Sequence, residues 1–297
     1  MRLPYLIACG LLLSGFGASA APVYKFIDAN GVVNYTDRPT PGAQIFVFRD
    51  RMVEHLEQQV HLDIHKNGSS TSFIARNDLY APVEVELRLT GLSNVGGEVP
   101  NSVRKVVPAR TNLPLMVVTA KQPARPIAFT QQFRYALGDP SRQPQPYAYP
   151  LPWVGGPFRV SQGPNGKFSH FGPRSRYAVD IAMPKGTPIV AARAGVVVKI
   201  ENGQSEGSSE ASGNFVRVLH DDGTMGVYLH LMQGSVSVNE GQPVQVGTAL
   251  GRSGNTGNST GPHLHFVIQR NTGMALESIP YQFNQPVGNL PNFALSR

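Results

Sequence analysis

The chain contains 297 residues, and its 26 lysines and arginines against 19 aspartates and glutamates give a formal net charge of +7. This length suffices for at least two domains, because single domains usually hold about 100 to 200 residues. The positive charge is spread along the chain, so the sequence argues against nucleic acid as the main partner. A single cysteine excludes an internal disulfide framework and a cysteine-rich zinc site.

Residues 1–20 have the pattern of an export signal that is removed from the mature protein. A basic residue precedes an apolar run from Leu3 to Phe16, and small residues end the segment at Ala18-Ser19-Ala20. The run is shorter than the roughly 20 residues that a helix needs to span a bilayer. We predict a mature chain that begins at Ala21, lies in the periplasm or outside the cell, and has no stable membrane insertion. Lipidation at Cys9 is a minor alternative.

Residues 21–45 predict a small domain built on a β-hairpin. Two apolar-alternating segments, Val23–Phe26 and Val32–Tyr35, enclose an Asn30-Gly31 turn. A hairpin of this size is not stable by itself, so we expect it to pack on another part of the protein. The segment resembles the short domain of uncharacterised role found at the start of many exported envelope proteins.

The rest of the chain predicts two further all-β domains and a linker. Residues 46–139 show period-two alternation and turn residues without any helical period, which favours an immunoglobulin-like β-sandwich; the clearest run is Val83, Val85, Leu87 and Leu89. Residues 140–152 are rich in proline and predict an extended linker. Residues 153–297 form a second strand-rich domain.

Two histidines at the start of a predicted strand give the strongest chemical signal. His263-Leu264-His265 follows a glycine-rich loop, Gly254–Pro262, and precedes the β-branched and aromatic run Phe266-Val267-Ile268. Residues two apart on a strand project to the same face, so both imidazoles point into one cavity. Taken alone, the motif fits a half-buried strand as well as a metal site.

Three more motifs precede this one in the C-terminal domain: Tyr177-Ala178-Val179-Asp180-Ile181-Ala182-Met183-Pro184, Gly186-Thr187-Pro188-Ile189-Val190-Ala191-Ala192 and Tyr228-Leu229-His230-Leu231. Together, from about Trp153 to Gln269, they resemble the lysostaphin-type zinc endopeptidases, the LytM-like murein hydrolases. The resemblance implies a β-rich peptidase domain with an open groove, Zn²⁺ as cofactor, and the peptide stems of peptidoglycan as substrate.

The resemblance also implies roles for single residues. Asp180 and His265 match the family's zinc ligands, and three N/O ligands with a position left for water are typical of catalytic zinc. Zinc lowers the pKa of its bound water to about 7. His230 and His263 match the two histidines that are not ligands, which orient or deprotonate the water, stabilise the oxyanion and protonate the leaving amine. The sequence leaves open which histidine does which.

The first zinc ligand departs from the family's commonest pattern, which has a histidine four residues before the aspartate. That position is Arg176, and an arginine stays protonated and cannot bind zinc. The nearest histidine is His170, ten residues before Asp180, and the turn residues Gly172 and Pro173 between them predict that the chain folds back. We therefore predict His170, Asp180 and His265 as the metal ligands. The alternative is a site that has lost a ligand.

These observations predict an exported zinc metalloendopeptidase that hydrolyses peptide cross-links of peptidoglycan. Two alternatives stay open: a catalytically inactive module that recruits or activates another cell-wall hydrolase, and a structural envelope protein with an incidental metal site. The sequence indicates neither the scissile bond nor the oligomeric state.

Overall fold

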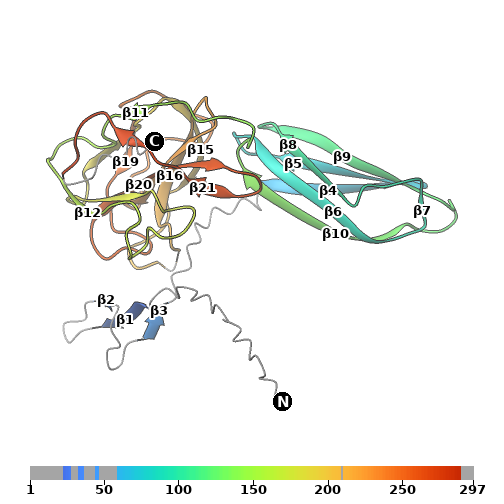
Figure 1. Cartoon of the computed structure of the whole chain (residues 1–297), viewed down its shortest axis with the longest axis horizontal. Helices are drawn as coiled ribbons and strands as arrows, with labels where there is room; N and C mark the ends of the chain where they lie inside the picture. Colours follow the sequence, from blue (N-terminus) through green and yellow to red (C-terminus); the bar gives the residue numbers. More distant parts are fainter. Residues whose placement is uncertain (1–22, 28–32, 37–43, 47–58, 209, 289–297) are drawn as a thin grey trace, which may run out of the picture. The chain divides into compact units, whose positions relative to one another are not determined.

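A computed structural model describes residues 23–27, 33–36, 44–46, 59–208 and 210–288. Every regular element in these residues is a β-strand, which confirms the all-β class (Figure 1). Within the same residues, no helix is long and apolar enough to cross a membrane. The predicted export signal lies outside the described residues. The chain divides into two compact units, residues 1–48 and 49–297.

The first unit contains the predicted hairpin. Strand β1 (Val23–Ile27) pairs antiparallel with β2 (Val33–Thr36), and the predicted Asn30-Gly31 turn lies outside the described residues. A third strand, β3 (Gln44–Phe46), pairs with the other edge of β1. The hairpin is thus extended to a three-stranded sheet in the order β2-β1-β3.

The second unit begins with the predicted β-sandwich. One antiparallel sheet has the order β4-β5-β9-β7 and the other the order β10-β6-β8. Inward and outward side chains alternate along β5, and its Phe73 meets Phe129 of the other sheet with ring centroids 5.1 Å apart. The strands are β4 (Val60–Asn67), β5 (Ser70–Asn77), β6 (Val83–Ser93), β7 (Val95–Gly96), β8 (Ser102–Val107), β9 (Thr111–Ala120) and β10 (Ala128–Leu137).

An eight-stranded antiparallel sheet forms the centre of the C-terminal domain. Its order is β12-β13-β20-β17-β16-β15-β18, with β21 also paired to β20. The strands are β12 (Arg159–Gln162), β13 (Val179–Ala182), β15 (Gly195–Glu201), β16 (Asn214–Leu219), β17 (Met225–Leu231), β18 (Pro243–Val244), β20 (His263–Asn271) and β21 (Leu276–Ser278). Two further pairs join β14 (Pro188–Val190) to β19 (Ala249–Arg252) and β11 (Ala148–Tyr149) to β22 (Gln282–Phe283).

The proline-rich segment, residues 140–152, packs against the C-terminal domain. The Gln145 backbone N–H donates to Asp222 Oδ2 at 2.9 Å, and β11 pairs in parallel with β22. The Tyr149 side chain is 3% exposed and belongs to the main hydrophobic cluster of the C-terminal domain. The segment therefore contributes to the core of this domain in addition to connecting it to the sandwich.

The sandwich and the C-terminal sheet share part of one hydrophobic core. Three buried residues of the C-terminal strands belong to the same cluster as the sandwich core: Val198, Met225 and Leu276. The buried Glu84 carboxylate of β6 accepts hydrogen bonds from the Asn271 side chain at 3.1 Å and from the Met274 backbone N–H at 2.6 Å. Asn271 ends β20 and His263 begins it, so these contacts lie at the end of β20 away from the histidines.

Tyr149→Ala tests the structural role of residues 140–152. The Tyr149 ring lies 5.7 Å from Tyr281 and 6.2 Å from Phe266, so the substitution leaves a cavity inside the aromatic cluster. We expect the free energy of unfolding, measured by denaturant titration, to fall by about 3 to 5 kcal/mol. Ala148→Ser, on the exposed neighbour, serves as the control. If Tyr149→Ala lowered the free energy of unfolding as little as the control does, residues 140–152 would serve only as a linker.

Candidate metal centre

Strand pairing brings Asp180 and His265 together. The antiparallel register of β13 and β20 places the two residues directly opposite each other. Side chains of directly opposed residues have Cβ atoms only about 4.5 to 5.5 Å apart, so they can meet above the sheet. His265 Nδ1 lies 2.8 Å from Asp180 Oδ1, and the two side chains are 9% and 11% exposed.

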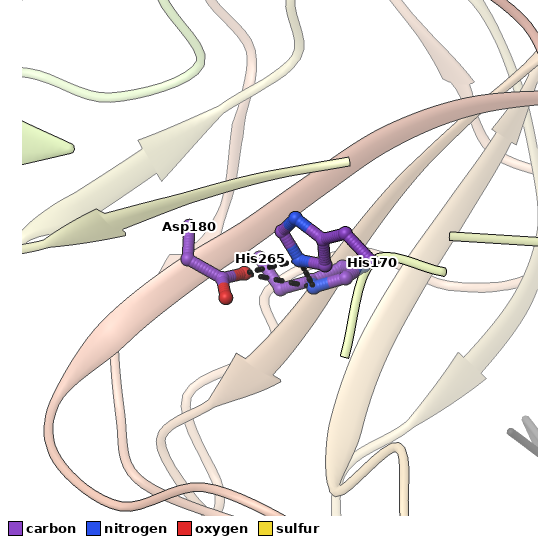
Figure 2. A group of neighbouring side chains, drawn as sticks. All are labelled: His170, Asp180 and His265. Carbon is purple, nitrogen blue, oxygen red and sulfur yellow. Dashed lines mark hydrogen bonds and ion pairs between the residues drawn. The ribbon is translucent and has the colours of Figure 1, made fainter. Parts of the chain in front are cut away.

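The loop between β12 and β13 supplies His170, the third residue predicted as a ligand. His170 is fully buried, and its Nε2 lies 3.2 Å from Asp180 Oδ1 and 3.3 Å from His265 Nδ1. Figure 2 shows the three side chains converging on one point. One ligand atom from each residue lies within 4.8 Å of the other two, which is close enough for the group to hold a metal ion.

The turn predicted at Gly172 brings His170 back toward Asp180. The Gly172 carbonyl accepts hydrogen bonds from the Ser175 and Arg176 N–H groups at 3.1 and 2.9 Å. Ser175 Oγ then donates to the Ser169 carbonyl at 2.9 Å and fixes the residue next to His170. Arg176 is exposed to solvent. The fold thus brings His170 next to Asp180 and His265, as the prediction of His170 as the first ligand requires.

The donor atoms of this group fit a divalent metal ion. His170 donates its Nδ1–H to the Gly163 carbonyl at 2.9 Å, so Nε2 is the ring nitrogen that faces Asp180. Burial raises the pKa of Asp180, but the charge of His265 and the hydrogen bonds from both histidines outweigh it and hold that pKa well below its ordinary value. Burial lowers the pKa of His265 against the attraction of Asp180. One carboxylate and two imidazoles form a donor set that Zn²⁺ accepts.

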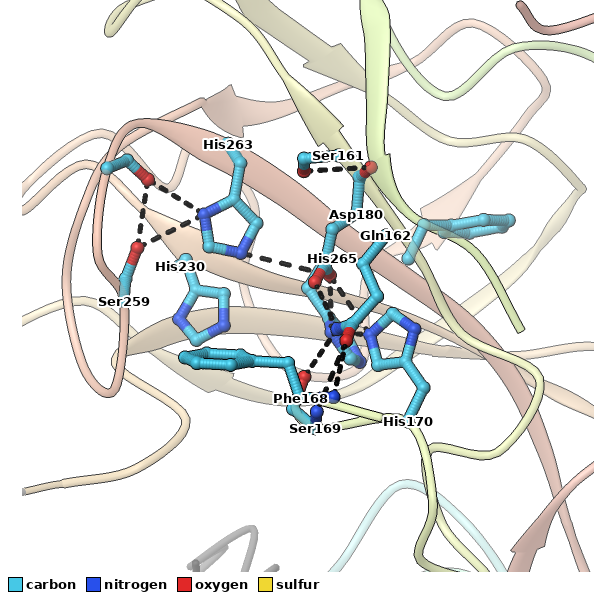
Figure 3. Close-up of polar contacts among 12 residues, drawn as sticks. Ser161, Gln162, Phe168, Ser169, His170, Asp180, His230, Ser259, His263 and His265 are labelled. Carbon is cyan, nitrogen blue, oxygen red and sulfur yellow. Dashed lines mark hydrogen bonds and ion pairs between the residues drawn. The ribbon is translucent and has the colours of Figure 1, made fainter. Parts of the chain in front are cut away.

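His230 and His263 lie next to this group (Figure 3). His263 Nε2 is 3.8 Å from Asp180 Oδ1, and the His230 ring centroid is 4.7 Å from that of His263 and 5.9 Å from that of His265. His263 donates its Nδ1–H to the Gly261 carbonyl at 2.8 Å, and His230 donates its own to the Thr256 carbonyl at 2.8 Å. In both rings a backbone carbonyl engages Nδ1, so Nε2 is the nitrogen left to exchange a proton.

The backbone of His230 is an unusual feature that the sequence did not predict. His230 has a φ of 64°, in the left-handed region that residues with a side chain rarely adopt. The pairing of β16 with β17 shifts register here, so the strand bulges at the residue that carries the imidazole. Bulges next to active sites re-aim side chains, and strained backbone gathers at such sites. Burial, reinforced by His263 and His265, holds the pKa of His230 well below its ordinary value.

Comparison with known proteins assigns this domain. Residues 174–277 match the family model of peptidase family M23, and residues 9–45 match a domain of unknown function, DUF4124. The C-terminal half of the chain carries an M23 peptidase domain. This finding confirms the resemblance to LytM-like and lysostaphin-type endopeptidases.

Several relatives share this M23 domain. The chain is 35% identical to the peptidoglycan DD-endopeptidase ShyA of Vibrio cholerae over 142 residues, which are 43% of this chain and 31% of that protein. It is 38% identical to lysostaphin of Staphylococcus staphylolyticus over 91 residues, which are 30% of this chain and 18% of that protein. The alignments thus span less than a third of these curated relatives.

Two solved structures are also similar. One is a mutant catalytic domain of the prophage-encoded M23 protein EnpA of Enterococcus faecalis, at 26% identity and a TM-score of 0.34, covering 44% of this chain and 93% of that chain. The other is lysostaphin of Staphylococcus simulans, at 31% identity and a TM-score of 0.31, covering 39% of this chain and 44% of that chain.

Substitution of the two histidines of β20 separates metal binding from turnover. We expect His265→Ala to lose bound zinc and activity together, because Nδ1 of His265 lies at the centre of the group. His263→Ala should keep most of its zinc and lose turnover, because its Nε2 lies at the edge of the group. Elemental analysis after dialysis measures the zinc per chain. Equal zinc loss in both variants would contradict the assignment.

His170→Ala and Arg176→Ala test the unusual first ligand. The first substitution should abolish hydrolysis and weaken zinc binding, since a buried imidazole facing Asp180 is lost. The second should leave zinc in place, because Arg176 is exposed. In a crystal grown with zinc, a ring nitrogen of His170 should lie about 2.0 to 2.1 Å from the ion. Unchanged zinc affinity in His170→Ala would exclude it as a ligand.

Proposed function

We propose that this protein is an exported zinc metalloendopeptidase that hydrolyses peptide cross-links of peptidoglycan. The observation that carries the proposal is the convergence of His170, Asp180 and His265 beside His230 and His263 in an M23 domain. The three buried N/O donors would hold the ion, and the two further histidines would act on the substrate. A structural zinc site would need no such pair of outer histidines, since its ligands complete the coordination sphere.

The chain's own residues supply the proton transfers. A bound zinc ion would polarise the scissile carbonyl and make the attacking water more acidic. His230 and His263 are the groups in reach, and in each of them Nε2 is the available nitrogen because a backbone carbonyl holds Nδ1–H. One of them accepts the proton of the attacking water, and the protonated imidazole then stabilises the oxyanion or protonates the leaving amine. The lowered pKa of His230 favours its neutral imidazole at neutral pH, which suits a general base.

The relatives support peptidoglycan as the substrate. ShyA and ShyC of Vibrio cholerae are named peptidoglycan DD-endopeptidases, and Mpg of Neisseria meningitidis is named a DD-carboxypeptidase/endopeptidase. The DD cross-link is therefore the first bond to test. A wall substrate also agrees with the export signal predicted in residues 1–20, and with a location in the periplasm or outside the cell.

The alternative of an inactive binding module rests on Arg176, which occupies the position where the family's commonest pattern has the first zinc ligand. The burial of His170 against Asp180 and His265 supports a complete ligand set instead. Both outer histidines are also present and oriented by hydrogen bonds. The proposal therefore favours an enzyme over a recruiting module or a structural protein with an incidental metal site.

Digestion of purified sacculi tests the proposal. We expect the zinc-loaded protein to convert cross-linked muropeptides to monomers, as measured by liquid chromatography and mass spectrometry. A chelator should abolish the conversion, because it removes the zinc ion from the three ligands. Added zinc should restore the conversion. His263→Ala serves as the folded, metal-bound control. The proposed activity would be contradicted if the zinc-loaded protein and this control left the same fraction of muropeptides cross-linked.

A further inference from the structure

Gln162, the last residue of β12, contacts two of the three candidate ligand segments at once. Its Oε1 accepts hydrogen bonds from the Phe168 and Ser169 backbone N–H groups at 3.0 and 3.3 Å. Its Nε2 donates to Asp180 Oδ2 at 3.0 Å and to Ser169 Oγ at 2.7 Å. Figure 3 shows Gln162 with these partners and with His170. Both polar atoms of the half-buried Gln162 amide are thus hydrogen-bonded.

The chemistry of these partners fixes the orientation of the amide. A backbone N–H can only donate, so the atom that faces Phe168 and Ser169 must be the oxygen. An ionised carboxylate can only accept, so the atom that faces Asp180 must be the NH₂ group. Glutamine satisfies both demands with one side chain. A glutamate would lack the donor, and an apolar residue would lack both.

The contacts of the Gln162 amide determine how the Asp180 carboxylate is oriented in the candidate metal site. Oδ1 of Asp180 faces His265 Nδ1 at 2.8 Å and His170 Nε2 at 3.2 Å, whereas Oδ2 is occupied by Gln162. The carboxylate is therefore turned so that Oδ1 faces the two imidazoles and Oδ2 faces the Gln162 amide. The same amide holds the two residues that precede His170. One side chain thus fixes the positions of two ligands relative to each other.

The surrounding backbone is built to admit this side chain. Gln162 lies opposite Asp180 in the β12–β13 pair, just after a shift in register. Gly166 lies so close that an added Cβ would be 2.3 Å from Gln162 Cγ and 2.7 Å from its Oε1. Gly166 is outside the left-handed region, so the need for glycine there is steric. The Gly166 carbonyl also accepts the His170 N–H at 3.0 Å.

We infer that Gln162 is the positioning residue of the metal site: its amide holds Asp180 to one-oxygen coordination and locks the loop that presents His170. The inference rests on the proposed zinc peptidase, but it concerns metal binding and is measured without substrate. Outer hydrogen-bond partners of metal ligands typically contribute 10- to 100-fold to metal affinity.

Two substitutions test the inference on the full mature chain. Gln162→Met keeps the length of the side chain and removes both the donor and the strong acceptor. Gly166→Ala leaves Gln162 intact and displaces its amide through the close Cβ contact. Gln245→Met, at an exposed glutamine between β18 and β19, is the matched control. Circular dichroism and the melting temperature of the metal-free proteins show whether each variant is folded.

Competition with a chromogenic chelator then gives the zinc affinity. We expect the dissociation constant to rise about 10- to 100-fold in Gln162→Met and Gly166→Ala, and to stay unchanged in Gln245→Met. The visible spectrum of the cobalt-substituted protein gives a second readout. Release of Asp180 Oδ2 should weaken the absorption, because five-coordinate cobalt absorbs less strongly than tetrahedral cobalt.

The outcomes separate this inference from the proposed function. Zinc affinity and cobalt spectra in both folded variants that match the wild type would overturn the role of Gln162, whatever the wild type does to sacculi. Weakened zinc binding with an altered cobalt spectrum would support the role even if the wild type left sacculi intact. If Gln162→Met fails to fold, Gly166→Ala decides by the same two measurements.

Discussion

The opposition of Asp180 and His265 across β13 and β20 is the constraint on which the rest of the site depends. A shift of one residue in this register would turn one of the two side chains to the other face of the sheet. The register is held on both sides, because β20 also pairs with β17, where Leu229 lies opposite His265. The central position of β20 therefore fixes this pair of side chains, and the loop adds His170 to a geometry that the sheet already supplies.

Backbone carbonyls then decide which nitrogen of each imidazole faces the centre. His170, His230 and His263 all donate Nδ1–H to a carbonyl, of Gly163, Thr256 and Gly261 respectively. His265 differs, since its Nδ1 faces Asp180. Each of the three carbonyls belongs to a loop, so the loops set the tautomers while the strands set the positions. Loop substitutions that move these carbonyls would change protonation without touching an imidazole.

The sequence predicted the parts of the site that depend on local pattern. Period-two alternation placed His263 and His265 on one face of a strand, and the turn at Gly172 allowed His170 to fold back, as the structure shows. It did not predict the left-handed backbone of His230, because that conformation follows from a bulge between paired strands. Nor did it single out Gln162, whose partners lie in two separate segments, the loop at Phe168 and Ser169 and strand β13 at Asp180. Such contacts depend on register, which a single sequence does not display.

Aromatic packing behind β20 explains why the proline-rich segment matters for a site that it does not touch. Successive residues of a strand point to opposite faces, so Phe266 projects away from the histidines into the core. There its ring lies 5.3 Å from Tyr281 and 6.2 Å from Tyr149, and the Tyr281 hydroxyl donates to the Phe266 carbonyl at 3.1 Å. Tyr149 comes from the proline-rich segment, so this segment helps to hold the residue next to His265. A fragment trimmed to the family match alone, residues 174–277, would keep every histidine of the site except His170, and it would also lose the Tyr149 and Tyr281 rings that pack behind β20.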